Sequence, residues 1–292
     1  MKKFQILIPV YNDWESVFKL LDEIDSQISI FEHEFSVLIV DDASTEKMTK
    51  TNINYKKLKS VNILKMKKNQ GHARCNATGV KYLSNNKKTE FDYLIVMDGD
   101  GEDRPEEIKL LVNKALNTQV SVAAKRIKRS EGPLFQTLYR FHKIITLIFA
   151  GKNMNFGNYT CLTKQDVIML SSKKSLWSSF PGSVKKYIKN IDYIESTRGI
   201  RYEGPSKMSL IKLIVLSFSI IATFKYQVLL RSLIICSILF LFLKTYYLMG
   251  LIFGIFLISF TVAIFIISNR ENREALENST QEIEKILSVY TS

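Results

Sequence analysis

The sequence contains few cysteines, and they are not spaced as bonded or metal-binding cysteines usually are. Three occur in 292 residues, at Cys75, Cys161 and Cys236, in unlike contexts and with no paired spacing. A disulfide framework and a zinc site both need cysteines at matched spacings. Both are therefore excluded as the basis of the fold, and we expect three ordinary buried thiols.

Two common devices for holding phosphates or nucleic acids are also missing. No glycine-rich phosphate loop of the Rossmann or Walker type follows any strand-like run, so phosphates would have to be held by a metal ion and arginine instead. No aromatic and basic stacking motif or recognition-helix pattern accompanies the positive charge. This absence argues against nucleic acid as a partner.

The amino terminus shows no targeting segment. Met1, Lys2 and Lys3 lead directly into a strand-like run, with no long apolar segment and no cleavage site. We therefore expect no signal peptide, and we expect the main domain to stay in the cytoplasm.

Positive charge is in excess but is confined to one part of the chain. The formal net charge is +13, yet residues 1–124 are balanced, with 18 basic and 18 acidic side chains. Residues 125–212 hold 17 basic and 5 acidic side chains. Lysine and arginine beside a bilayer attract anionic lipid head groups, and a polyanionic ligand could use the same field. The basic segment is therefore expected next to a membrane.

Long apolar runs are absent from most of the chain and dominate residues 226–268, where Arg231 and Lys244 are the only charged residues. The two halves of this stretch, which Lys244 separates, each have the length that crosses a bilayer, and a soluble helix of that length would normally show a polar face. We predict two transmembrane helices. Arg231, Arg270 and Arg273 flank them, which favours a cytoplasmic location for both ends.

The segments on either side of this stretch carry weaker patterns. Residues 208–225 are apolar with lysines around them, which predicts an interfacial amphipathic helix lying along the bilayer surface. Residues 269–292 are polar and are expected to form a cytoplasmic tail. Within the tail, Ile283, Ile286 and Leu287 recur at helical spacing, which predicts a short peripheral helix.

Residues 1–207 show the rhythm of an α/β domain. Strand-like apolar runs are separated by segments long enough for helices, which indicates a mainly parallel, Rossmann-like sheet with helices on both faces. The strand-like runs are residues 4–10, 35–40, 61–66, 93–97 and 120–124.

An acidic stretch follows the fourth of these runs. Asp98, Asp100 and Glu102 come directly after the apolar residues, and Pro105 then begins a predicted helix. The carboxylates therefore lie at the carboxyl edge of the sheet, where open α/β proteins bind ligands. Carboxylates this close repel one another unless they share a cation, and oxygen ligands favour Mg²⁺ or Mn²⁺. An acidic solvated loop is the alternative interpretation.

Three other loops reach the same edge of the predicted sheet. They are Pro9-Val10-Tyr11-Asn12-Asp13, Asp41-Asp42-Ala43-Ser44 and Asn69-Gln70-Gly71-His72-Ala73-Arg74. Loops that follow parallel strands converge, so a pocket there would combine aromatic, amide, carboxylate and metal-binding groups. That combination suits a nucleotide.

Together these segments resemble a known family, the inverting family 2 glycosyltransferases with a GT-A fold, and within it the polyprenyl-phosphate sugar synthases such as dolichol-phosphate mannose synthase. The resemblance covers most of residues 4–208. Its motifs occur in the family's order: Ile8-Pro9-Val10-Tyr11-Asn12-Asp13, Val40-Asp41-Asp42-Ala43-Ser44, Asn69 with Gly71, Asp98-Gly99-Asp100-Gly101-Glu102 with Pro105-Glu106, and Arg201 with Gly204, Ser206 and Lys207.

The resemblance implies a role for each group of residues. The implied donor-binding residues, for a UDP- or GDP-linked sugar, are Pro9, Tyr11, Asp13, Asp41, Asp42 and Asp98. The implied ligands of Mg²⁺ or Mn²⁺ are Asp98, Asp100 and Glu102. The implied acceptor-phosphate residues are Arg140, Arg201, Ser206 and Lys207. The implied catalytic residues are Asp100, Arg126 and Arg201, of which Arg126 contacts phosphate. Charge facing a membrane is an equal alternative for Arg140.

Three positions need separate comment. Glu102 replaces the family's usual Gln. Residues 153–159 contain no aspartate, whereas many synthases carry one in that segment. His72 stands at a predicted helix start, where a histidine is more often a capping or packing residue than a catalyst.

The distribution of acidic residues indicates which kind of acceptor the protein uses. A hydroxyl acceptor needs a carboxylate base, whereas a phosphate acceptor is already ionised. In the resembled family, enzymes with hydroxyl acceptors commonly place an acidic pair in the region that corresponds to residues 153–159 and 177–182, and neither segment contains an acid here. Asp166, Asp192 and Glu195 are expected to be structural. These features favour a lipid-phosphate acceptor.

The sequence therefore predicts a GT-A glycosyltransferase domain in residues 1–207 that is attached to the cytoplasmic membrane as a multi-pass protein. The expected reaction moves a sugar from a nucleotide-sugar donor to a polyprenyl phosphate. Transfer to a hydroxyl of a lipid-linked glycan, and an inactive membrane scaffold of the same fold, are the alternatives. A homo-oligomer remains open.

Overall fold

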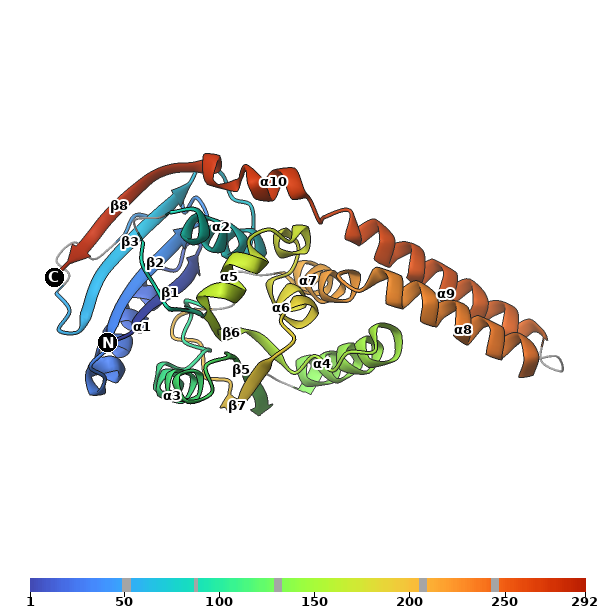
Figure 1. Cartoon of the computed structure of the whole chain (residues 1–292). Helices are drawn as coiled ribbons and strands as arrows, with labels where there is room; N and C mark the ends of the chain where they lie inside the picture. The colour runs from blue at the N-terminus through green and yellow to red at the C-terminus, as the bar shows by residue number, and fades with distance from the viewer. Residues whose placement is uncertain (49–53, 87–88, 129–132, 205–208, 243–246) are drawn as a thin grey trace.

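A computed structural model of the chain is shown in Figure 1, and it describes all residues except 49–53, 87–88, 129–132, 205–208 and 243–246. Within the described residues, eight strands form one sheet in the order β7-β5-β6-β4-β1-β2-β3-β8. The strands are β1 (Lys3–Val10), β2 (Glu34–Asp41), β3 (Leu58–Met66), β4 (Tyr93–Val96), β5 (Ser121–Lys128), β6 (Phe156–Thr163), β7 (Ile191–Thr197) and β8 (Ile283–Thr291). The five strand-like runs are therefore confirmed as β1 to β5.

The centre of the sheet is parallel, as the sequence predicts. β1 pairs in parallel with β2 and β4, β2 with β3, and β5 with β7. β6 runs antiparallel between β4 and β5, and β8 runs antiparallel to β3. The carboxyl ends of β1, β2 and β4 therefore meet at one edge of the sheet.

Helices cover both faces of the sheet, and each face has its own apolar core. Helices α1 (Trp14–Gln27) and α3 (Ile108–Thr118) cover one face, on which Ile6 and Ile8 of β1 lie. Helices α2 (His72–Asn85), α5 (Lys164–Leu170) and α6 (Phe180–Tyr187) cover the other face. β4 is buried along its whole length, which explains its unbroken apolar sequence.

Close packing of α2 on the sheet depends on a small residue. A Cβ added at Gly79 would lie 2.3 Å from Cδ1 of Leu7, so a larger side chain there would push α2 away from β1. The cysteines are mostly as expected, because Cys75 and Cys161 are buried free thiols. Cys236 differs from the prediction, since it is only partly buried.

Helices α8 (Lys225–Phe242) and α9 (Tyr247–Ser268) extend together from one end of the domain (Figure 1). Helix α4 (Pro133–Ile145), which continues as a π-helical turn η3 (Thr146–Ala150), and helix α7 (Leu210–Ala222) share an apolar cluster with them. In the described residues one helical stretch, Tyr247–Glu277, is long and apolar enough to cross a bilayer. Helices α7 and α8 qualify only together, as a pair bent by 82°. Two transmembrane helices therefore remain a prediction.

The carboxyl-terminal segment differs from its predicted structure. The sequence predicts a peripheral helix there, but the chain forms a short helix α10 (Arg273–Glu277), a 3-10 turn η5 (Ser279–Glu282) and the edge strand β8. β8 pairs with β3 along its length, and the Tyr290 hydroxyl donates to the Tyr55 carbonyl at 2.6 Å. Apolar residues at helical spacing are a local signal, and the open backbone edge of β3 outweighs it.

Candidate functional site

The acidic stretch forms a turn at the carboxyl end of β4. The backbone N–H of Asp98 donates to Asp103 Oδ2 at 3.0 Å, and that of Glu102 donates to Asp100 Oδ1 at 3.1 Å. Gly101 has a φ of +84°, a conformation that favours glycine. The turn, called the acidic loop below (residues 98–103), therefore holds its carboxylates at the predicted edge of the sheet.

Asp98 faces α2 and β6. Its Oδ1 lies 3.2 Å from His72 Nε2 and accepts a hydrogen bond from Asn158 Nδ2 at 2.9 Å. Burial would raise the pKa of Asp98, but the charge of His72 and the Asn158 bond hold it below its usual value. Conversely, burial would lower the pKa of His72, and Asp98 raises it above the ordinary value. The contact between His72 Nε2 and Asp98 Oδ1 therefore favours the charged form of each group.

His72 is a site residue that the sequence analysis did not select. It begins α2 as expected, but its ring contacts Asp98 as well as packing in the fold. Asn158 Nδ2 also lies 2.7 Å from His72 Nε2. The place of His72 in the loop after β3 is the signal that could have indicated this contact, because that loop ends at the same edge as the acidic loop.

Asp100 and Glu102 face two arginines from residues 198–202, called the covering segment below. Arg201 Nη1 donates to Asp100 Oδ2 at 2.7 Å, and its Nη2 pairs with Asp13. Arg198 pairs with Glu102. Burial raises the pKa values of Asp100 and Glu102, Asp98 adds to this rise at Asp100, and the arginines oppose it. The arginines therefore stabilise two ionised carboxylates.

The covering segment is also attached to the acidic loop through its backbone. Gly199 N–H donates to the Glu102 carbonyl at 2.8 Å, and Tyr202 N–H donates to the Asp100 carbonyl at 2.9 Å. The Tyr202 ring lies against Gly101, where an added Cβ would approach a ring carbon to 2.5 Å. The two segments, about a hundred positions apart in the sequence, therefore form one structural unit.

The fourth carboxylate of the loop, Asp103, is paired with Arg126 of β5. Arg126 Nη2 lies 3.4 Å from Asp103 Oδ1, and only 3% of the Asp103 side chain is exposed. Burial, and then the nearby charge of Asp98, raise the pKa of Asp103 to about 7. The Arg126 guanidinium also lies close to Gly157, where an added Cβ would be 2.7 Å from Nη2. Arg126 therefore reaches the predicted edge.

The loops after β1 and β2 are joined beside the acidic loop. Asn12 has a φ of +48°, its N–H donates to Ser44 Oγ at 2.9 Å, and its side-chain carbonyl accepts the Thr45 N–H at 2.8 Å. Asp41 is buried and accepts the Ser44 N–H at 2.9 Å. Pro9, one residue before the end of β1, has its carbonyl close to Gly99, and Tyr11 is 38% exposed. The predicted donor residues thus lie together, although their roles remain predictions.

Both carboxylate oxygens of Asp42 accept hydrogen bonds from the backbone of the protein itself. Its Oδ1 and Oδ2 accept the N–H groups of Gln70 and Gly71 at 2.7 and 2.8 Å. Burial raises the pKa of Asp42, and these two bonds oppose the rise. Asp42 therefore shapes the loop after β3 and carries His72 into place, in addition to any contact with a donor.

Replacing Asp42 by Asn is expected to destabilise this loop. The amide would keep one acceptor and turn an N–H toward the second backbone donor, so we expect a loss of about 1–3 kcal/mol in the free energy of unfolding. Chemical unfolding of the purified variant measures this loss. Asp192→Asn, which removes an exposed carboxylate 3.5 Å from Lys114, serves as the control with a change near zero. Equal stabilities for the two variants would contradict the assignment.

The predicted acceptor residues are only partly brought to this edge. Arg201 lies at this edge, where it pairs with Asp13 and Asp100. Arg140 is exposed on α4, and its assignment to an acceptor phosphate or to a membrane-facing surface stays a prediction. Ser206 and Lys207 lie outside the described residues.

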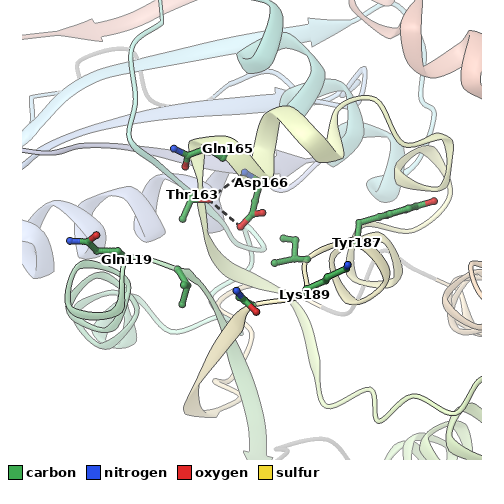
Figure 2. Close-up of a pocket in the computed structure, with 9 residues that line it drawn as sticks. Gln119, Thr163, Gln165, Asp166, Tyr187 and Lys189 are labelled. Carbon is green, nitrogen blue, oxygen red and sulfur yellow. Dashed lines mark hydrogen bonds between the residues drawn. The ribbon is translucent and has the colours of Figure 1, made fainter.

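The opposite edge of the sheet holds a separate pocket of about 330 Å³ (Figure 2). Asp166 lies in it and accepts hydrogen bonds from Ser121 Oγ at 2.5 Å and Thr163 Oγ1 at 3.1 Å. Thr163 also caps α5 by accepting the Asp166 N–H. The prediction that Asp166 is structural is therefore confirmed.

The three predicted metal ligands lie in one loop, but each is paired with a different side chain of the protein. Among the described residues, no three His, Cys, Asp or Glu side chains are grouped closely enough to hold a metal ion. The donor set itself, carboxylate oxygens from Asp98, Asp100 and Glu102, has the chemistry that Mg²⁺ and Mn²⁺ prefer. The chemical type of these side chains therefore suits a divalent cation, and arginines are paired with two of them, Asp100 and Glu102.

The fold and this edge define an α/β domain of the GT-A type. The family model described as glycosyl transferase family 2 matches residues 5–180, so the chain belongs to that family and is a glycosyltransferase. The membership that the sequence motifs indicate is confirmed.

Curated relatives agree with this assignment, and solved structures agree with the fold. The undecaprenyl-phosphate 4-deoxy-4-formamido-L-arabinose transferase of Proteus mirabilis is 23% identical over 76% of this chain and 67% of its own length. The enzyme of the same name from Yersinia pestis is 25% identical over the same shares. Mannosyl-3-phosphoglycerate synthase from Rubrobacter xylanophilus has a TM-score of 0.54 at 12% identity, covering 76% of this chain and 72% of its own. Glucosyl-3-phosphoglycerate synthase from Mycobacterium tuberculosis, solved with Mn²⁺ and UDP-glucose, has a TM-score of 0.51 at 12% identity, covering 78% and 80%. These structures support the fold alone.

Proposed function

We propose that this glycosyltransferase moves a sugar from a nucleotide-sugar donor, with inversion, to the phosphate of a polyprenyl phosphate at the cytoplasmic face of a membrane. One observation carries the choice of a phosphate acceptor. Each carboxylate of the acidic loop is paired with a cation, namely Asp98 with His72, Asp100 with Arg201, Glu102 with Arg198 and Asp103 with Arg126. A carboxylate whose oxygens are engaged by a neighbouring side chain is not free to accept the proton of a hydroxyl acceptor, whereas an ionised phosphate needs no base.

The relatives support the same acceptor class. The curated relatives are named as undecaprenyl-phosphate sugar transferases. The structural neighbour from Mycobacterium tuberculosis was solved with UDP-glucose, which makes a UDP-linked sugar the first donor to test. The basic residues 125–212 and the apolar helices α7 to α9 favour a reaction at a bilayer surface.

The reaction is a single displacement. An oxygen of the acceptor phosphate forms a bond to the anomeric carbon while the bond from that carbon to the donor diphosphate breaks, and the electron pair leaves with the diphosphate. Arg126, at the same edge as the acidic loop, would place a fixed positive charge near the leaving group. Arg201 would hold the incoming phosphate. The joined loops after β1 and β2 would hold the nucleoside.

A divalent cation is part of this proposal. Asp98, Asp100 and Glu102 would hold Mg²⁺ or Mn²⁺, which when bound supplies charge that stabilises the leaving diphosphate. The residues of the chain keep the site in place, because Asn158 and His72 orient Asp98 and the Gly101 turn sets the directions of its neighbours.

One assay tests the proposed function. Full-length protein purified in detergent is incubated with Mn²⁺, a panel of UDP- and GDP-sugars and a short-chain polyprenyl phosphate, and products are separated by chromatography. We expect a sugar attached to the lipid phosphate. Donor hydrolysis without that product would instead favour a hydroxyl acceptor on a lipid-linked glycan. If calorimetry shows no binding of any donor, the protein is a scaffold of the same fold.

A further inference from the structure

Two arginines hold carboxylates that the proposed cation site requires. Arg201 bridges Asp100 and Asp13, and Arg198 pairs with Glu102. Asp98 is the third proposed ligand, and its partner is His72. Two of the three ligands are therefore neutralised from within the chain by one short segment.

These ion pairs are shielded from water. The side chains of Asp100, Glu102, Arg198 and Arg201 are only 14–17% exposed. Charges at such positions interact more strongly than charges at the surface, and a carboxylate that loses its partner there is costly. A guanidinium and a divalent cation also repel each other, so Asp100 cannot hold both closely at little cost. The structure shows these oxygens paired with arginine, and a divalent cation would have to displace that partner.

The arrangement allows the arginine side chains to move without moving the backbone. The covering segment is fixed to the acidic loop by the N–H groups of Gly199 and Tyr202, which bond to backbone carbonyls. Those bonds do not involve the guanidinium groups. The chain then leads to α7, which begins at Leu210 beside the apolar helices. A side chain leaving Asp100 would therefore remain next to the acidic loop.

We propose that Arg198 and Arg201 compete with the divalent cation for Glu102 and Asp100, and that cation binding releases Arg201 to bind the acceptor phosphate. This inference rests on the proposed function, because it uses the same cation and the same acceptor. It makes the two arginines determinants of cation affinity. It also couples the two halves of the site. When the cation binds on the donor side, Arg201 exchanges its carboxylate partner for the acceptor phosphate, and no covalent step is needed.

Direct measurement of cation binding tests the competition. Mn²⁺ is titrated into nucleotide-free full-length protein, and free Mn²⁺ is followed by electron paramagnetic resonance. Arg198→Gln and Arg201→Gln are expected to bind Mn²⁺ about tenfold more tightly than the unmodified protein, because an opposing charge at contact shifts carboxylate affinity by at least this factor. Lys189→Gln is the matched control, since it removes one positive charge at the pocket on the opposite edge of the sheet.

Unchanged or weaker Mn²⁺ binding in both arginine variants would overturn the competition. A gain of the same size in Lys189→Gln would also overturn it, because the effect would then come from net charge alone. Folding is checked by thermal unfolding. In EDTA, Arg201→Gln is expected to melt below the unmodified protein, and Mn²⁺ is expected to remove this difference. Should Arg201→Gln not fold, Arg201→Lys keeps the charge but cannot bridge two carboxylates, and its Mn²⁺ affinity should still rise.

Phosphate binding tests the release of Arg201. Farnesyl phosphate and inorganic phosphate are each titrated with and without Mn²⁺. For the unmodified protein, Mn²⁺ is expected to tighten binding of farnesyl phosphate. This gain should be lost in Arg201→Gln and kept in Lys189→Gln. An equal gain in Arg201→Gln overturns the coupling. If Mn²⁺ tightens binding of farnesyl phosphate but not of inorganic phosphate, the site recognises the lipid as well as the phosphate. If Mn²⁺ tightens binding of both equally, the site recognises the phosphate group alone.

The failure of this inference can be told apart from failure of the proposed function. If the arginine variants bind Mn²⁺ more tightly but no sugar is transferred to lipid phosphate in the product assay, the competition stands and the proposed reaction is wrong. If sugar is transferred and Mn²⁺ affinity does not respond to the arginines, the reaction stands and the competition is wrong.

Discussion

Replacing Asp100 by Asn is expected to lower the rate of sugar transfer by about 10²–10³-fold, the loss typical of removing one electrostatic partner of a transition state. Asp100 lies at the centre of the acidic loop, where it accepts the Glu102 N–H and pairs with Arg201. Asn keeps the size of the side chain and can still accept from the Glu102 N–H. The charge that a divalent cation requires is lost. We therefore expect the Mn²⁺ dependence of donor binding to disappear with the rate.

The measurement combines the rate of transfer to a short polyprenyl phosphate with calorimetric donor affinity, each with Mn²⁺ and with EDTA. Glu102→Gln is the informative comparison, because it introduces the residue that the resembled family usually carries and should keep activity within about tenfold. Glu90→Gln, on the exposed partner of Lys3, is the neutral control. Donor affinity that is unchanged in Asp100→Asn and still responds to Mn²⁺ would refute the assignment of the metal ligands.

The sequence predicted the site well where chemistry follows directly from topology. An apolar run that ends in acids must be buried, and parallel strands bring their carboxyl ends together, so Asp98, Asp100, Asp41 and Pro9 could be assigned to one edge. The structure places them there, in the loops after β4, β2 and β1. These arguments need only the apolar pattern of each strand and the order of the strands and loops along the chain.

The partners of the acids could not be predicted in the same way. Arg201 meets Asp13 across 188 positions of the sequence, and Asn158 meets Asp98 across 60. Neither pairing leaves a periodic signal. Asp42 shows a related limit, because its motif indicated a donor contact and its oxygens are used by Gln70 and Gly71. Residue type and position indicate where a side chain lies, but its partner is set by packing.

The carboxyl-terminal strand shows how a tertiary edge can outweigh local pattern. Ile283, Ile286 and Leu287 match helical spacing, yet the backbone of β3 would be open without a neighbour, and β8 supplies one. Pairing with β3 satisfies backbone groups along nine residues, whereas a helix of similar length on the surface would be marginal in water. A strand that follows the apolar helices therefore also ties them back to the sheet, on the side away from β7 (Figure 1).

Removing residues 283–292 is accordingly expected to destabilise the whole domain. The deletion exposes the β3 edge, removes the hydrogen bond from Tyr290 to Tyr55, and uncovers part of the core against which Val289 and Tyr290 pack. We expect a fall of about 10 °C in the melting temperature, which corresponds to several kcal/mol in a domain of this size, and association through the open edge. Thermal unfolding and light scattering of the purified protein measure both effects.

Two point variants separate the strand from the loss of chain length. Tyr290→Phe removes only the hydroxyl that bonds to Tyr55 and should lower the free energy of unfolding by about 1 kcal/mol. Ile286→Thr changes a side chain that is 53% exposed and keeps β-branching, so it should have almost no effect on stability. A truncated protein that melts with the full chain and stays monodisperse would show that the edge of β3 does not need β8. In that case β8 would contribute nothing measurable to the stability of the sheet.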